Sequence, residues 1–152
     1  MATDEHGSAV SDTGTASLAH RQVSIGWWAL LVFVAGGLIL EALHGLKVDW
    51  YLNAGNETRR LLLRLAHAHG ALVAVLTIIY GLTLRCYPLS RARFIARVLL
   101  AALVLLPGGF MLGGLWLYDG DPGLGIVLSP VGALALCLAV GLIALDLTRR
   151  GP

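Results

Sequence analysis

Four polar residues in a mostly apolar chain are of types that can bind a metal, ligate a haem or transfer protons. They are the carboxylate Glu41 and the imidazoles His44, His67 and His69. Imidazole and carboxylate suit zinc, copper or iron, and an ionisable residue inside a membrane is costly enough to suggest a function. Because two consecutive apolar segments joined by a short loop carry these residues, we expect all four at a similar depth on the outer side of a membrane.

Helical spacing limits how these residues can act together. Glu41 and His44 are three positions apart and therefore share a helix face. His67 and His69 are two apart, which places them about 200° apart around a helix. We expect His67 to face the first helix, because it neighbours the small residues Ala66 and Gly70. Glu41, His44 and His67 are thus the candidate site for a metal, an axial haem ligand or a proton relay, and His69 is a weaker candidate.

The alternative interpretation places the same residues at the headgroup boundary, where the cost of burying charge falls away. There they would be hydrated, or would pair with Arg64 or with one another, and would orient the first loop. A di-iron bundle requires two Glu-x-x-His pairs, and this chain has only the pair Glu41 and His44. No GxSxG, Walker, HExxH or GxGxxG motif is present, so we expect no catalytic residue and no hydrolase, kinase or dehydrogenase activity.

The segments that must position these residues are long and apolar. Of the 152 residues, 57% are hydrophobic and 13% charged, and mean hydropathy is +0.79. Four apolar runs are each long enough to cross a hydrocarbon core of about 30 Å: residues 24–43, 62–84, 94–118 and 124–147. Backbone amides in lipid must bond internally. The sequence therefore predicts an all-α fold, a four-transmembrane-helix antiparallel bundle with both termini on the same side.

Charge and composition predict the flanking segments and the orientation. Residues 1–22 form a polar stretch that we expect to be a flexible tail, residues 23–148 form the membrane domain, and residues 149–152 form a short basic tail. Seven arginines would share the side of the termini, against four Lys and Arg residues on the other side. The excess predicts cytoplasmic termini. No basic stripe for nucleic acid is present.

Small residues predict where the spans pack, because membrane helices associate through close contact at such positions. The fourth span carries a stripe at four-residue spacing, the second carries a shorter one, and the third carries a GxxxG pair. These residues are Ser129, Ala133, Cys137 and Gly141; Ala66, Gly70 and Ala74; and Gly109 and Gly113. Pro107 in the third span is expected to kink that helix without ending it.

Three segments together resemble the DUF423 family of small four-span membrane proteins. The residues 42–47 (ALHGLK) are similar to its AHGLK-type segment, and residues 113–118 and 125–133 are similar to its Gly-rich third-span ending and its G-x-I-T-P-x-G-G stretch. Ser129 and Ala133 replace Thr and Gly of that pattern, and Glu41 replaces a small residue. The resemblance implies a four-span bundle in a bacterial inner membrane, which we favour, or in its organellar equivalent, and the family has no settled activity. It also implies that His44, Pro130 and Gly132 serve loop geometry and helix approach.

The leading prediction is a non-enzymatic structural or accessory membrane protein. Its partners would be the lipid bilayer and either further copies of itself or a larger membrane complex, and no cofactor is expected. The alternative is a metal-handling or redox protein that binds haem or a divalent transition metal at the Glu/His cluster. A proton or solute transporter is less favoured, because no inverted repeat with matching broken helices is visible.

Overall fold

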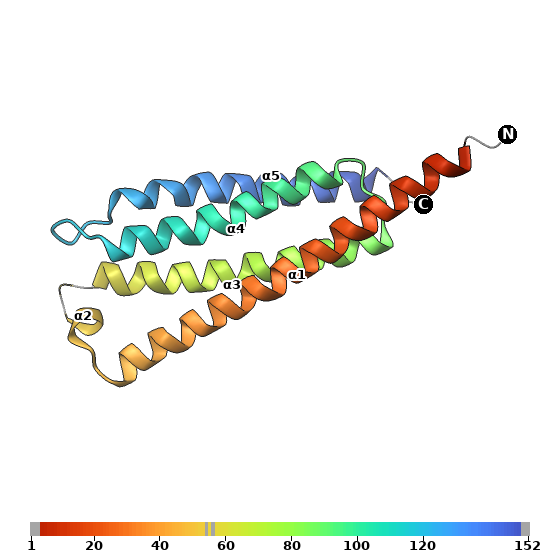
Figure 1. Cartoon of the computed structure of the whole chain (residues 1–152). Coiled ribbons are helices and arrows are strands. Elements are labelled where there is room, and N and C mark those ends of the chain that lie inside the picture. Colours follow the sequence, from red (N-terminus) through yellow and green to blue (C-terminus); the bar gives the residue numbers. More distant parts are fainter. Residues whose placement is uncertain (1–3, 54, 56, 150–152) are drawn as a thin grey trace.

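The computed structural model describes residues 4–53, 55 and 57–149, and within these ranges it contains helices and loops but no β-strand (Figure 1). Residues 1–3 of the predicted N-terminal tail and residues 150–152 of the predicted basic tail lie outside the described residues. The elements, in chain order, are α1 (Asp4–Gly45), α2 (Asp49–Leu52), α3 (Glu57–Cys86), α4 (Ala92–Leu115), the 3-10 turn η2 (Leu124–Val127) and α5 (Leu128–Thr148).

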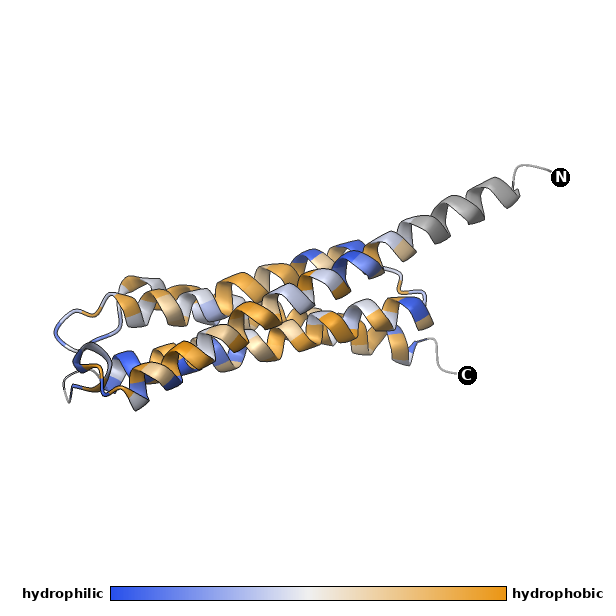
Figure 2. Ribbon diagram, turned by 60° about the horizontal axis from the view of Figure 1, so that its bottom comes forward, coloured by the Kyte–Doolittle hydropathy of each residue, from blue (hydrophilic) through white to orange (hydrophobic). Residues whose placement is uncertain are grey.

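Four helical segments are long and apolar enough to cross a membrane, which confirms the four spans expected from the sequence. They are Gly14–Gly45, Glu57–Cys86, Ala92–Leu115 and Leu124–Thr148. Figure 2 shows the apolar residues along the middle of the helices and the hydrophilic residues gathered toward the two ends. These features are consistent with a multi-pass membrane protein. α4 continues through Pro107 without interruption.

The first helix begins earlier than the composition predicts. α1 has 42 residues, about 63 Å at 1.5 Å per residue, and it includes most of the segment expected to be a flexible tail. Within that segment Ala19 and Gln22 are buried. Gly81 of α3 permits this packing, because a methyl group there would lie 2.9 Å from the carbonyl oxygen of Ala19. The helix extension therefore packs on the end of α3, which the local composition does not reveal.

The four long helices pack against one another in the order α1, α3, α4, α5 (Figure 1). The helices α1 and α5 are not packed neighbours. The two central helices, α3 and α4, are accordingly more buried than the outer two. In the most apolar 18-residue stretch of each span, 39% of the residues of α3 and 44% of those of α4 are buried, against 6% for α1 and 17% for α5. The bundle is open, and α1 and α5 form its two edges.

Helices α4 and α5 approach most closely at two glycines. A methyl group on Gly109 would overlap the backbone nitrogen of Ser129 and lie 2.5 Å from its hydroxyl oxygen. A methyl group on Gly132 would overlap the backbone of Leu106. The buried Ser129 hydroxyl donates a hydrogen bond of 3.2 Å to the Leu106 carbonyl oxygen. Small side chains thus bring the two backbones together.

The small residues predicted on the fourth span do not all face the bundle. Ser129 is buried, Ala133 is half-buried, and Cys137 and Gly141 are exposed. A methyl group on Gly141 would meet no atom within 4 Å. Residues four apart in an α-helix drift by about 40° per step, so Gly141 lies about 120° around the axis from Ser129. The face toward α4 follows Ser129, Gly132 and Ala139 instead.

The chain reverses direction after α4 in a tight turn at Tyr118–Asp121. Asp119 and Gly120 have φ angles of 52° and 90°. The amide of Tyr118 donates to the carbonyl of Asp121 at 3.1 Å, and the amide of Asp121 donates to the carbonyl of Tyr118 at 2.8 Å. Positive φ at both central residues is the geometry that favours Asp-Gly in two-residue turns.

Two neighbouring glycines in α4 allow a direct test of the helix contact. We expect Gly109→Ala to lower the stability of the folded protein in detergent by about 1–3 kcal/mol, because the added methyl group would force apart two backbones. Gly108→Ala should not destabilise it, since a methyl group there meets nothing within 4 Å. Thermal unfolding of both variants measures the difference, and equal midpoints would contradict the close contact.

Candidate functional site

A cavity of about 600 Å³ lies at the end of α1 that is nearest α2. The helices α1 and α3 diverge toward this end (Figure 1). Pockets of this size can hold small ligands. The side deeper along α1 is apolar, with Val34 and Leu38, and polar residues complete the lining: Glu41, His44, Tyr51, Arg64 and His67. Three of the four sequence-predicted candidates therefore line one cavity, together with two residues that were not predicted as a site.

His67 is fixed by a contact between α3 and α1. Its Nδ1 atom lies 2.7 Å from the carbonyl oxygen of Phe33. A carbonyl oxygen can only accept a hydrogen bond, so Nδ1 donates and the Nε2 lone pair of the neutral ring remains available. Gly37 makes room for this ring, because a methyl group there would lie 2.9 Å from both ring nitrogens. His67 thus faces α1, the orientation expected from its spacing.

His69 points to a different neighbour and does not line the cavity. Its Nδ1 lies 2.9 Å from the carbonyl oxygen of Leu65. Its ring centroid is 5.0 Å from that of Phe110 on α4. The half-buried imidazole therefore packs between α3 and α4, and the structure separates His69 from Glu41, His44 and His67.

Glu41, His44 and Arg64 are exposed side chains at the wall of the cavity. Within the described ranges they make no ion pair or hydrogen bond with one another, so the pairing that the sequence offered as an alternative is absent there. In the part of the chain that the structure describes, no group of three or more His, Cys, Asp and Glu side chains is arranged to hold a metal ion. The cavity combines a carboxylate, a guanidinium and two imidazoles, and one of these imidazoles, that of His67, uses its Nδ1 atom for the Phe33 carbonyl.

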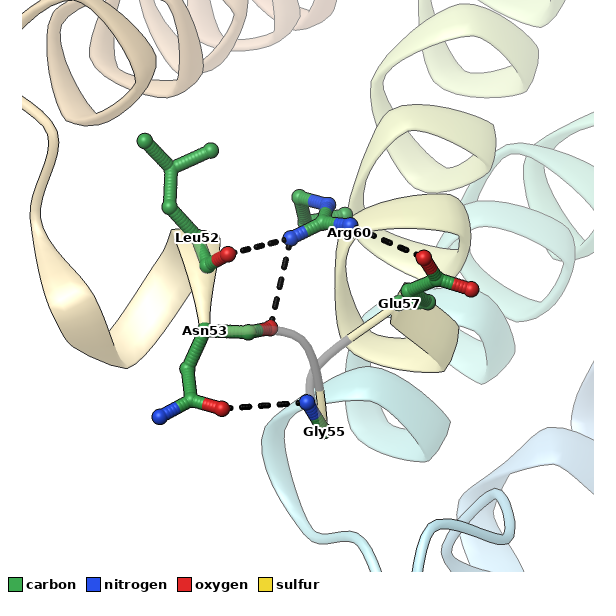
Figure 3. Close-up of polar contacts among 5 residues, drawn as sticks. All are labelled: Leu52, Asn53, Gly55, Glu57 and Arg60. Carbon is green, nitrogen blue, oxygen red and sulfur yellow. Dashed lines mark hydrogen bonds and ion pairs between the residues drawn. The ribbon is translucent and has the colours of Figure 1, made fainter.

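Arg60, at the start of α3, contacts the end of α2 (Figure 3). Arg60 donates to the carbonyl oxygens of Leu52 at 2.7 Å and Asn53 at 3.3 Å, and it lies 3.6 Å from Glu57. Asn53 in turn accepts a hydrogen bond of 3.0 Å from the amide of Gly55. These contacts fix the turn between α2 and α3.

Arg59 links α2 to a second helix. Its guanidinium carbon lies 4.5 Å from the ring centroid of Trp50, a cation–π contact. It also donates to the carbonyl oxygens of Trp50 at 3.0 Å and Gly114 at 3.2 Å. Arg59 and Arg60 therefore position α2.

Tyr51 was missed as a lining residue by the sequence analysis. Its side chain is 1% exposed and closes one wall of the cavity. An aromatic residue just outside a span resembles an interfacial anchor in the sequence, and only the fold of α2 places Tyr51 inward. The signal in the sequence for this placement is the pair Arg59 and Arg60, because these arginines supply the hydrogen-bond donors for carbonyl oxygens at α2.

Comparison of the chain with family models, with curated proteins and with solved structures yields no match in any of the three. The resemblance to the DUF423 family stays a prediction.

Two adjacent glycines of α1 test the contact that orients His67. We expect Gly37→Ala to displace the imidazole from the Phe33 carbonyl and to cost about 1 kcal/mol, the usual net contribution of one hydrogen bond. Gly36→Ala should have no such cost, because a methyl group at Gly36 meets no atom within 4 Å. The measurement is thermal unfolding in detergent with the His67 ring resonances as a second readout. An unmoved ring in the Gly37 variant would refute the contact.

Proposed function

We propose that this protein is a small, non-enzymatic, multi-pass membrane protein that acts as an accessory component by assembling through the exposed face of α5. In this proposal its four spans form an antiparallel bundle in a bacterial inner membrane, with both termini in the cytoplasm. The partner is a second copy of the chain or another subunit of a membrane complex.

Contacts at the two ends of the helices support the antiparallel order. At one end of the bundle Gly14 of α1 lies close to Arg93 of α4, because a methyl group added to Gly14 would be 3.4 Å from the Arg93 guanidinium. At the same end the Ser90 hydroxyl donates a hydrogen bond of 2.8 Å to Asp146 of α5. The early part of α1, the connection between α3 and α4, and the end of α5 thus lie together. Near the other end, Arg59 reaches Gly114. The arginine excess on the side of the termini supports a cytoplasmic location for them.

The exposed small face of α5 is the observation that carries the assembly proposal. α5 packs against α4 and η2 and has its opposite side open. On that side Cys137 and Gly141 are exposed, and the space above Gly141 is empty to 4 Å. Small residues let a second helix approach closely in a bilayer, where apolar surface alone supplies little attraction. The edge position of α5 leaves this face accessible to a partner.

Gly141→Leu tests the proposal without disturbing the chain itself. The new side chain has room within one molecule, so thermal unfolding of the isolated chain should stay unchanged. We expect helix association to weaken at least about tenfold, or about 1.4 kcal/mol, which cross-linking in native membranes and size in mild detergent would measure. Val140→Leu, at an exposed position about 100° around the helix from Gly141, is the control. Identical assembly of both variants and the parent protein would overturn the proposal.

A second candidate function is the binding of a divalent transition metal or a haem in the cavity that Glu41, His44 and His67 line, named here the Glu41–His67 cavity. The observation that favours it is the hydrogen bond from His67 Nδ1 to the Phe33 carbonyl. Ligating histidines usually donate their other ring nitrogen to such an acceptor, which fixes the ring and directs the free nitrogen at the metal. His44 and Glu41 border the same cavity and supply further ligands of suitable type.

An optical spectrum and elemental analysis of the purified protein decide this second candidate. It requires a Soret band or a stoichiometric metal that disappears in His67→Ala and persists in His69→Ala, because His69 packs on Phe110 away from the cavity. A colourless, metal-free protein after expression with added haem and metal salts would exclude it. The assembly proposal is independent of this result.

A further inference from the structure

A basic cavity of about 300 Å³ lies between α1 and α4, near the opposite end of α1 from the Glu41–His67 cavity. Arg21 and Gln22 of α1 line it on one side, and Arg93 and Arg97 of α4 line it on the other. Arg93 and Arg97 are one helical turn apart and so project from the same face of α4. Three exposed arginines from two helices therefore line one small volume.

Among the described residues, the charge of this cavity is not balanced. None of those that line it is acidic, and none of the three arginines forms an ion pair within the described ranges. Like charges that share a site repel one another, and an anion between them would relieve that repulsion. Guanidinium groups match phosphate oxygens in geometry and can donate two hydrogen bonds to one phosphate.

Gln22 adds a second and independent sign of a ligand. Its side chain is 1% exposed, and its Oε1 atom is a buried acceptor without a hydrogen-bond partner in the described part of the chain. A buried acceptor left without a partner costs free energy. A ligand that satisfies both this atom and the arginines must carry an anion and a hydroxyl or similar donor.

The seam between α1 and α4 continues from this cavity as an apolar groove. A volume of about 510 Å³ follows along the two helices, and the two helices make few direct contacts with each other. Its walls are apolar side chains of both helices, among them Ile25, Trp28, Val32, Leu103, Val104 and Met111. The seam is therefore basic at its end and apolar along the span.

We infer that the α1–α4 seam binds an anionic phospholipid whose headgroup carries hydroxyl groups, as phosphatidylglycerol does. The phosphate lies among Arg21, Arg93 and Arg97, a headgroup hydroxyl donates to Gln22 Oε1, and an acyl chain follows the apolar groove. A free phosphate would satisfy the arginines but leave the groove empty, so the groove selects the lipid. The inference does not depend on assembly through α5 or on a metal in the other cavity.

Lipid retention by the full-length protein tests the inference. We expect protein reconstituted in nanodiscs of phosphatidylcholine with phosphatidylglycerol to retain phosphatidylglycerol selectively after detergent extraction, as measured by mass spectrometry. Arg93→Gln combined with Arg97→Gln should reduce this retention about tenfold or more. Arg85→Gln, which removes an arginine at the end of α3 outside this cavity, is the matched control.

Further arms distinguish the source of the phosphate and the role of Gln22. Inorganic phosphate and glycerol phosphate at millimolar concentration should not displace the lipid. The Gln22→Leu variant should still retain anionic lipid but should lose the preference for phosphatidylglycerol over phosphatidic acid. Displacement by inorganic phosphate, retention of phosphatidylcholine to the same extent, or equal loss in the Arg85 control would each overturn the inference. Circular dichroism of every variant verifies that the helices remain folded.

Discussion

Contact between helix backbones at positions without large side chains is the constraint on which the arrangement depends. Within a bilayer, lipid is as apolar as leucine, so burial of apolar surface does not draw spans together as it does in water. Association then relies on dense packing and on hydrogen bonds. At Gly109 and Gly132 the α4 and α5 backbones come so close that no methyl group fits, and Ser129 adds a hydrogen bond between them. The same principle joins α1 to α3 at Gly26 and Gly81.

The cavity at Glu41 and His44 follows from where these contacts stop. Gly26 and Gly81 hold the first part of α1 against α3, and farther along, Phe33 lies over Gly70 while the His67 ring occupies the space above Gly37. Beyond His67 the facing residues become larger and charged, and the two helices diverge (Figure 1). His67 therefore marks the last tight contact, and its hydrogen bond to Phe33 is both part of the helix packing and part of the cavity wall.

The sequence predicts the spans and the facing of His67 because these depend on local pattern and helical period. It does not predict the open order of the helices, because the choice of neighbours depends on which small faces meet. Gly141 shows the difference: its spacing suggests a packing residue, but the 40° drift per four residues turns it away from α4. Tyr51 shows another, since only the arginine contacts to α2 place its ring inward.

The two ends of α1 present opposite solutions to the problem of polar groups at the edge of a membrane. At one end a carboxylate, a guanidinium and two imidazoles line one volume, so opposite charges lie at the same site. At the other end three arginines line a second volume with Gln22, whose amide oxygen is buried, and none of the described residues that line it is acidic. Positive charge near a headgroup layer attracts anionic lipid over a distance set by ionic screening. A groove that leads from those arginines into the apolar span converts this general attraction into a defined site, because the acyl chain fixes the lipid while the guanidinium groups hold its phosphate.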